Sequence, residues 1–350
     1  MDKFFLRVDN YDCLAAFFSY LCAMTLHIFN PGHDEALAAG TPYYTHTLAA
    51  RTLCDALWRL PSVWAETGDM VVNENRLATV KIDWATVERI EPWGWDAALV
   101  HKLRRAGAPP NLLPSEDTLN EIRAQSSRLT ATNLLAMLPR SVVCESCWCT
   151  DIERVEEAVA HYGRAMLKAP WSSSGRGVFA AKHPMTVPVR QRCEKIIATQ
   201  GAVEVEPFFE RVFDLALEFN MCGNGKCEYL GLSYFLTNER GEYRGNDLRL
   251  SYVGAKNFES FELKETIAAV SHGLSTLVGN RYVGPVGVDM MLFMDKGHLR
   301  LHPCIEVNLR RTMGWVALQL CKGLSQVDHK VFALHAAADG SGWSVKDAEK

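Results

Sequence analysis

Glu306, Asn308 and Arg310 stand at alternating positions toward the end of the chain and are separated by apolar residues. Residues spaced by two project from one face of a strand, so this spacing predicts one polar face and one packed face. A merely solvated face would more often carry Lys, Thr or Glu than this combination. The planar guanidinium group of Arg310 would suit a phosphoryl or carboxylate group beside the two oxygen-bearing side chains.

Asp289 lies in the preceding apolar segment and is predicted to join this face. If residues 294–297 form a four-residue turn, Asp289 pairs with His302 in an antiparallel hairpin and points to the same side as Glu306 and Asn308. Two carboxylates and an amide oxygen are hard ligands that suit Mg²⁺ while it bridges nucleotide phosphates. The sequence therefore predicts a magnesium site on this hairpin.

A predicted strand that ends at Lys168 runs into a loop of small residues, which together have the parts that a triphosphate needs. Backbone N–H groups and hydroxyls would approach the phosphate oxygens, and the lysine would supply a cation. The loop comprises Ser172, Ser173, Ser174, Gly175, Arg176 and Gly177. Because the lysine precedes the glycines, this is not a Walker A loop, and the alternative is an ordinary flexible connection.

Between these two regions, a short apolar segment ends in Glu206 and continues through Phe208 and Phe209 to Asp214. A purine nucleotide requires apolar walls, backbone hydrogen bonds and an acceptor for the ribose hydroxyls, and this segment offers all of them. The alternative interpretation is that the two phenylalanines are ordinary core residues.

The elements that must position these residues begin with an apolar strand at residues 24–29, followed by a turn and the acidic start of a helix. A helical pattern at residues 45–57 and short apolar strands around residues 70–72 and 97–100 complete a small α/β domain with a mainly parallel sheet. Residues 118–137 then predict a single helix.

The composition excludes several classes of protein. The chain has 350 residues, 48% hydrophobic and 22% charged, and a formal net charge of −4, as in a folded, soluble protein. It contains no Lys/Arg-rich block, so no nucleic acid partner is expected. No run reaches the roughly 18 apolar residues of a membrane span, so no membrane partner is expected. Eleven irregularly spaced cysteines favour a reducing, cytoplasmic location.

The order of these motifs resembles that of the ATP-grasp superfamily. A strand with Lys168 and a Ser/Gly loop comes first, then a strand ending in Glu206, then Asp289 followed by a Glu-x-Asn-x-Arg pattern. The resemblance covers roughly residues 125–325, and residues 24–125 look like the domain that precedes them in that superfamily. It implies an α/β N-terminal domain followed by a two-lobed α+β ATP-grasp domain that holds ATP between its lobes.

The resemblance also implies roles for the nucleotide-binding residues. Lys168 would contact the α- and β-phosphates of ATP, and the Ser/Gly loop would close over them. Glu206 would be the acid near the adenine amino group, the two phenylalanines would line the base, and Asp214 would bind the ribose.

The three predicted metal ligands match those of one or two Mg²⁺ ions in the superfamily, with Mn²⁺ as a possible substitute. Arg310 matches the arginine of the Glu-x-Asn-x-Arg form, and Arg128 would replace a lysine expected before the first lobe. The pattern departs at Gly287, where many ligases carry a basic residue two positions before the metal-binding aspartate.

The reaction implied by the resemblance is phosphoryl transfer from ATP to a small-molecule carboxylate. The resulting acylphosphate would then be attacked by an amine or another nucleophile. Lys168 and Arg310 would act as catalytic residues by positioning the phosphates and neutralising charge. A kinase that acts on small molecules, or a protein that binds ATP without turnover, would use the same nucleotide site and remains an alternative.

Substrate contacts are expected from Asn30, His33 and Asp34, because ligands of open α/β sheets bind at the carboxyl ends of the strands. His33 is also compatible with a capping or surface role. Arg311 is a further candidate. The sequence carries no pattern that identifies either substrate or an oligomeric state.

The expected organisation divides the chain into five segments. They are an N-terminal extension at residues 1–23, an α/β domain at 24–125, a first ATP-grasp lobe at 126–200, a second lobe with the metal site at 201–330 and a C-terminal tail at 331–350. The extension contains an apolar run typical of a signal peptide, although Asp9 and Asp12 disturb the charge pattern. We favour the alternative that Met24 is the true start.

Cys144, Cys147 and Cys149 form the one motif that points to another class of protein. A C-x-x-C pair with a third cysteine nearby is compatible with a zinc or redox module. Zinc would require a fourth ligand, which no neighbouring Cys or His pair supplies. We therefore favour free thiols and keep the zinc or redox module as an alternative.

Overall fold

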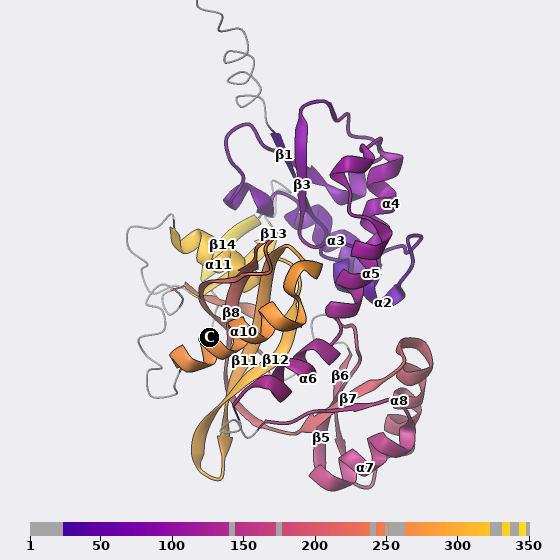
Figure 1. Cartoon of the computed structure of the whole chain (residues 1–350), viewed down its shortest axis with the longest axis vertical. Helices are drawn as coiled ribbons and strands as arrows, with labels where there is room; N and C mark the ends of the chain where they lie inside the picture. The colour runs from indigo at the N-terminus through magenta and orange to yellow at the C-terminus, as the bar shows by residue number, and fades with distance from the viewer. Residues whose placement is uncertain are drawn as a thin grey trace, which may run out of the picture.

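The computed structural model describes residues 24–139, 144–172, 177–238, 243–248, 251, 263–322, 331–336 and 343–347. Figure 1 shows an N-terminal domain at the top, a large sheet in the middle and a smaller lobe at the lower right. No helix within the described ranges is long and apolar enough to cross a membrane. The expected extension at residues 1–23 and the loop residues Ser173, Ser174, Gly175 and Arg176 lie outside the described residues.

The N-terminal domain contains the predicted parallel sheet. β1 (Met24–Phe29) lies between β2 (Met70–Asn73) and β3 (Val87–Pro92), and both pairings are parallel. Leu26 and Ile28 of β1 are buried against Leu99 and Leu103 in one apolar core. The helices of this region are α2 (His33–Ala39), α3 (Leu48–Leu57), α4 (Ala97–Arg105) and α5 (Glu116–Gln125), with short 3₁₀ turns η1 (Leu60–Val63), η2 (Glu74–Arg76) and η3 (Pro110–Leu112).

The strand predicted at residues 97–100 is wrong, because these residues begin α4. The carboxylate of Asp96 accepts a hydrogen bond of 2.8 Å from the backbone N–H of Leu99, which caps the helix at its N-terminus. This short apolar run is therefore a buried helix face.

The single helix predicted at residues 118–137 is also wrong, because it is divided into α5 and α6 (Leu129–Met137). Between them, the backbone N–H of Arg128 donates to the carbonyl of Pro170 at 3.0 Å instead of to a carbonyl one turn earlier. The break turns the Arg128 side chain toward the centre of the molecule, where it becomes part of the site described below.

The first lobe is a four-stranded sheet with the order β4-β7-β5-β6 and antiparallel pairing throughout. Its core joins Val155 of the covering helix to Leu167 and Val205 of the sheet. Its elements are β4 (Cys147–Cys149), α7 (Ile152–Tyr162), β5 (Arg164–Lys168), β6 (Val178–Lys182), α8 (Val187–Gln200) and β7 (Val203–Pro207).

The second lobe is a seven-stranded sheet with the order β12-β11-β8-β9-β10-β13-β14. One face packs against α6 and α10, and the opposite face carries α11 and the site. Its elements are β8 (Glu210–Met221), β9 (Cys227–Thr237), β10 (Tyr243–Asp247), α10 (Leu263–Leu277), η5 (Gly279–Arg281), β11 (Gly284–Asp295), β12 (His298–Asn308), α11 (Met313–Lys322), β13 (Val331–Ala336) and β14 (Trp343–Asp347).

The sheets cross two of the expected segment boundaries. β7 lies beyond residue 200 but pairs with β5, so the first-lobe sheet extends past that point. In addition, α6 lies within the expected first lobe but contacts β12 and α10 of the second lobe. β13 and β14 pair with each other and, through β10, continue the second-lobe sheet into the expected tail.

The register of the β11–β12 hairpin differs from the one expected. The turn contains two residues, Lys296 and Gly297, whose φ angles of 50° and 82° are both positive, as a tight hairpin turn requires. An irregularity between Asp289 and Met291 shifts the register, so Asp289 faces Glu306 directly instead of His302. The predicted shared face is therefore present, although the turn used to derive it was wrong.

Candidate active site

A cavity of about 370 Å³ lies between the N-terminal domain and the second-lobe sheet. The predicted residues Asp289, Glu306, Asn308 and Arg310 all line it, and so does Ser172 at the start of the Ser/Gly loop. Four of these residues come from the β11–β12 hairpin or its end, and Ser172 follows β5 of the first lobe. The structure thus brings the start of the Ser/Gly loop to the hairpin. Apart from Ser172, the predicted nucleotide-binding residues that it describes do not line this cavity: they include Lys168, Glu206, Phe208, Phe209 and Asp214.

The predicted metal ligands converge on one point. Asn308 Nδ2 donates to Asp289 Oδ2 at 3.4 Å, which leaves the Asn308 carbonyl oxygen available to a cation. Burial and, after it, the neighbouring carboxylate of Glu306 raise the pKa of Asp289 to about 7. Two carboxylates that repel each other beside an amide oxygen fit Mg²⁺. Across the described ranges, no group of three or more His, Cys, Asp or Glu is arranged to hold a metal ion, so this donor set depends on the amide.

Arg128 is buried next to these ligands. Its Nη2 donates to Glu306 Oε2 at 3.0 Å and to Ser172 Oγ at 3.4 Å. The guanidinium group therefore connects the start of the Ser/Gly loop to a predicted metal ligand. At the base of that loop, the backbone N–H of Ala169 donates to the carbonyl of Gly177 at 2.9 Å, which holds the two ends of the loop together.

Arg310 reaches across the cavity to the N-terminal domain. Its Nε and Nη2 atoms donate to the two carboxylate oxygens of Asp34, each at 3.0 Å, in a bidentate ion pair. Burial raises the pKa of Asp34, but Arg310, His33 and Arg128 together lower it further, so the net pKa lies below its usual value. Arg310 thus holds a carboxylate in the geometry that a substrate carboxylate or phosphoryl group would adopt.

Lys168 lies within a buried acidic pair. Its Nζ is 2.7 Å from Glu206 Oε1 and 3.8 Å from Glu204 Oε2, and all three side chains are at most 5% exposed. His302 Nε2 lies 3.8 Å from the other oxygen of Glu206. Burial, with a smaller contribution from Lys168, holds the pKa of His302 well below its usual value, so the ring is neutral. The structure therefore groups the predicted phosphate-binding lysine and the predicted adenine-binding acid.

The two phenylalanines lie in different surroundings. Phe209 packs on the ring of Phe293 at a centroid distance of 4.5 Å and on His302 at 5.2 Å, beside the Glu206 carboxylate. Phe208 instead lies under the guanidinium group of Arg164 at 3.3 Å. The aromatic wall predicted for a purine is thus placed next to Glu206 only by Phe209.

Asp214 lies on β8, two residues from the register partner of Asp289. Its Oδ2 accepts a hydrogen bond of 2.5 Å from Thr237 Oγ1, and Arg211 Nη1 lies 3.5 Å away. Burial raises the pKa of Asp214 despite that hydrogen bond. The carboxylate is on the cavity side of the sheet, near the metal ligands.

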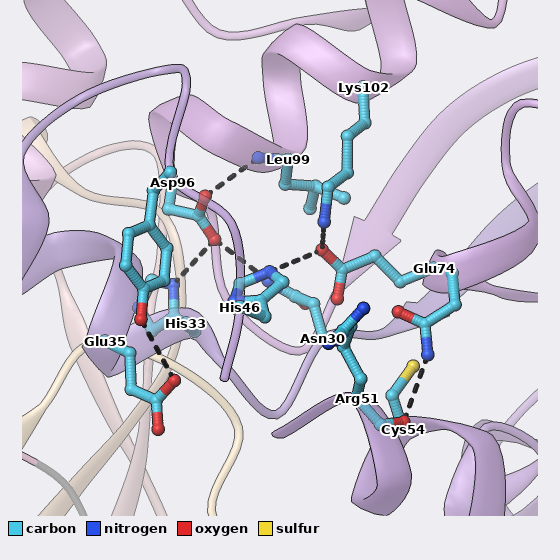
Figure 2. A network of polar contacts seen from close by, with 12 residues as sticks. Asn30, His33, Glu35, His46, Arg51, Cys54, Glu74, Asp96, Leu99 and Lys102 are labelled. Atoms are coloured by element: carbon cyan, nitrogen blue, oxygen red, sulfur yellow. Dashed lines mark hydrogen bonds and ion pairs between the residues drawn. The ribbon is translucent and has the colours of Figure 1, made fainter. Parts of the chain in front are cut away.

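Asn30 and His33, predicted to contact substrate, belong to a buried polar network in the N-terminal domain (Figure 2). Asn30 Nδ2 donates to the Gly94 carbonyl at 2.8 Å and to Asp96 Oδ2 at 3.1 Å. His33 Nδ1 lies 3.5 Å from the same Asp96 oxygen. Asn30 lines neither the main cavity nor a smaller adjoining one, and His33 lines only the smaller one.

Arg311, the other predicted substrate contact, points away from the cavity. Its Nη1 donates to the Pro92 carbonyl at 2.6 Å, its Nη2 pairs with Glu91, and its guanidinium group lies beside Trp64 and Trp315. These contacts join the second lobe to the N-terminal domain. Of the predicted substrate contacts, only Asp34 lines the main cavity.

Glu218 is a functional candidate that the sequence analysis missed. Its carboxylate lines the main cavity, is 1% exposed, and accepts hydrogen bonds from Thr312 Oγ1 at 2.9 Å and from Ser233 Oγ at 3.1 Å. Burial raises the pKa of Glu218 to about 8, although these hydrogen bonds lower it. The signal was present, because Asp214, Ala216 and Glu218 alternate on one strand and so share its face.

The cysteine motif does not gather into a metal site. Cys147 is exposed and its sulfur lies 3.3 Å from the Tyr162 hydroxyl, whereas Cys149 is buried in the first-lobe core. Cys144 contacts the Leu301 carbonyl at 4.0 Å. All three are free thiols, and their different surroundings give no support to the zinc alternative.

The site and the sheets together define a class of protein: a nucleotide-sized site enclosed by an α/β domain and two α+β lobes. No family model matches the sequence, and no curated protein matches it. The biotin carboxylase domain of 2-oxoglutarate carboxylase from Hydrogenobacter thermophilus is similar with a TM-score of 0.50 and 14% identity, covering 86% of this chain and 70% of that chain.

Pyruvate carboxylase from Rhizobium etli is similar with a TM-score of 0.50 and 16% identity, covering 85% of this chain and 27% of that chain. D-cycloserine synthetase gives a TM-score of 0.48 and 13% identity, covering 86% of this chain and 97% of that chain. The two carboxylases show that this chain has the ATP-grasp fold, so the expected fold class is confirmed.

Proposed function

We propose that the chain is an ATP- and Mg²⁺-dependent ligase, which activates a small-molecule carboxylate as an acylphosphate and joins it to an amine or another nucleophile. The observation that carries this proposal is the convergence of Asp289, Glu306 and Asn308 on the wall of one cavity, with Ser172 opposite. The similar 2-oxoglutarate carboxylase domain was solved with Mg-ADP and bicarbonate. Its bound ligands support the same class of cofactor and substrate here.

In this proposal, Asp289, Glu306 and the amide oxygen of Asn308 hold one or two Mg²⁺ ions, or Mn²⁺ in their place. When bound, the metal neutralises charge on the phosphates. Arg128 pairs with Glu306 in the structure and contacts Ser172 at the start of the Ser/Gly loop. In the proposed complex it releases Glu306 to the metal and binds phosphate oxygens beside this loop.

The remaining residues bind nucleotide and orient the acceptor. Glu206, which pairs with Lys168 in the structure, binds the adenine amino group instead. Lys168 is then free to extend from β5 toward the α- and β-phosphates. Phe209 packs on the base, and Asp214 accepts from the ribose hydroxyls. Arg310 releases Asp34 and binds the substrate carboxylate that is activated, because both carboxylates can pair with the guanidinium group in the same bidentate geometry.

The test replaces the metal ligands without changing their shape. Asp289→Asn and Glu306→Gln should each weaken Mg²⁺-dependent ADP binding by more than about tenfold, since losses of 10–100-fold follow even from changes behind the ligands. Isothermal titration calorimetry with and without Mg²⁺ measures this. Asp295→Asn, at the far end of the same hairpin, is the control and should bind normally. Unchanged binding in either ligand variant would remove the metal site.

The reaction class is tested with hydroxylamine, which converts an acylphosphate into a hydroxamate. Pools of carboxylic acids are incubated with the full chain, ATP and Mg²⁺, and a ligase is expected to yield hydroxamate and inorganic phosphate in equal amounts. A stable phosphorylated product without hydroxamate would instead identify a kinase.

A further inference from the structure

Glu218 is an acidic side chain of the cavity wall that has no role in the proposed nucleotide and metal chemistry. Gly287, two residues before Asp289, is its register partner on the adjacent strand, and Asp289 itself faces Ala216. Glu218 therefore lies two residues, or about 7 Å, along β8 from Ala216, which faces the predicted metal ligand Asp289. A group bound there would be within reach of an acylphosphate held at the metal site.

The surroundings of Glu218 fix its orientation but supply no cationic side chain as a partner. Burial raises the pKa of Glu218 to about 8, and a bound ammonium group would lower this pKa and favour the ionised carboxylate. Thr312 donates to both carboxylate oxygens and Ser233 to one of them, and both donors are neutral. Among the described residues, no Lys, Arg or His nitrogen forms an ion pair with Glu218, and Arg310 is committed to Asp34. Each carboxylate oxygen has two acceptor positions, so the group can still accept hydrogen bonds from a ligand.

Two glycines make the space around this carboxylate. A Cβ atom on Gly314 would lie 2.1 Å from both Glu218 Oε1 and Ser233 Oγ, and one on Gly287 would lie 2.5 Å from the methyl group of Thr312. Any other residue at these positions would therefore displace the acid or its donors. The backbone leaves room for a buried carboxylate here, beside the N-terminus of α11.

The same cavity also has apolar lining residues. Phe29, Leu57 and Trp93 of the N-terminal domain line it together with Met313 at the start of α11. Phe29 and Trp93 pack edge to face at 5.0 Å within a buried apolar cluster that borders the cavity. A ligand that complements both the Glu218 carboxylate and the apolar lining residues carries a cationic donor at one end and an apolar body at the other.

We propose that Glu218 binds the ammonium group of the nucleophile, and that the nucleophile is a primary amine with an apolar or aromatic body. This inference rests on the proposed ligase reaction and specifies its second substrate. A hydrogen-bonded ion pair in a buried site discriminates strongly against a neutral analogue, because the carboxylate would lose its cationic partner.

The test compares 2-phenylethylamine, 2-phenylethanol and 3-phenylpropionate as probes of the full-length chain by calorimetry. The amine is expected to bind about tenfold to 100-fold more tightly than the alcohol, the range for a hydrogen bond to a charged group, and the anion is expected to bind most weakly. In Glu218→Gln, the affinities for the amine and for the alcohol should differ by no more than about twofold. Glu228→Gln, an exposed change on β9, is the matched control and should keep the preference.

Equal binding of amine and alcohol by the unaltered chain, or a preserved preference in Glu218→Gln, would overturn the proposal, as would no saturable binding of the amine. Mg²⁺-dependent ADP binding is measured in the same samples and should be unchanged in Glu218→Gln. A loss of that binding in the variant would make Glu218 part of the metal site and would also overturn the proposal. Failure of the unaltered chain to bind Mg-ADP would instead remove the ligase function, whatever the probes show.

Discussion

Acidic side chains dominate the described wall of the main cavity, where Asp34, Glu218, Asp289 and Glu306 accompany a single basic residue, Arg310. Such a surface favours cations over anions. If a nucleotide binds here as proposed, metal ions must neutralise its phosphate charges. The same charge balance favours an amine over a second carboxylate as the other substrate.

At the scale of single residues, the cysteine motif provides a direct test of the redox alternative. Burial raises the pKa of both Cys144 and Cys149 to about 12. Alkylation requires the thiolate, so at pH 7.5 both thiols should react with iodoacetamide more than about 1,000-fold slower than an ordinary cysteine. Exposed Cys147 should be labelled first. Peptide mass spectrometry after timed labelling measures the order, and labelling in urea is the control.

Rapid labelling of Cys144 or Cys149 in the folded protein would contradict this assignment. It would restore the possibility of a reactive dithiol in the first lobe. The expected result would argue against a redox role for Cys144 and Cys149.

At the scale of elements, the sequence predicted what depends on local pattern and missed what depends on long-range contacts. The alternation at Glu306 and Asn308 was enough to place both on one face. The register that sets Asp289 against Glu306 was not predictable, because it depends on a two-residue turn and an irregularity within the strand. The break before α6 depends on a hydrogen bond from Arg128 to distant Pro170.

The same limit applies to the candidate site. Asn30 and His33 have the residue types of substrate contacts, and their position after β1 is the expected one. Their side chains are instead directed to Asp96, which lies 66 residues after Asn30. Glu218 alternates with Asp214 on β8, but only the folded sheet shows that their shared face is the cavity face.

The start of α4 offers a prediction at this scale, because Asp96 both caps the helix and holds the buried network of Figure 2. Asp96→Ala should lower the free energy of unfolding by more than the roughly 1 kcal/mol of an ordinary cap, since Asn30 and His33 lose a buried partner. Ser115→Ala, which removes the exposed cap of α5, is the matched control. Urea denaturation followed by circular dichroism compares the two, and equal losses would show that Asp96 acts only as a cap.

At the scale of the whole molecule, two adjacent arginines connect the second lobe to the N-terminal domain with different consequences. Arg310 pairs with Asp34 inside the cavity, where a ligand can replace the carboxylate. Arg311 is buried outside the cavity, against Glu91 and the Pro92 carbonyl. We infer that the first arginine serves ligand binding and that the second keeps the domain in place as a wall of the cavity.

This division of roles predicts different outcomes for two substitutions that affect the same acid. Arg311→Met keeps the apolar stem but leaves the Pro92 carbonyl and Glu91 without their donor, and should cost about 2–3 kcal/mol of stability. That is less than for a fully buried pair, because the Glu91 side chain is 27% exposed. Arg89→Met also removes a partner of Glu91, but Arg89 is 66% exposed, so the loss should stay below about 1 kcal/mol.

The urea midpoint of tryptophan fluorescence measures both, because Trp64 and Trp315 lie beside Arg311. Mg²⁺-dependent ADP binding should survive in Arg311→Met, since the proposed metal ligands all come from the β11–β12 hairpin. If Arg89→Met proves as costly as Arg311→Met, the buried arginine does not fix the N-terminal domain and the cavity wall must be held by its apolar contacts.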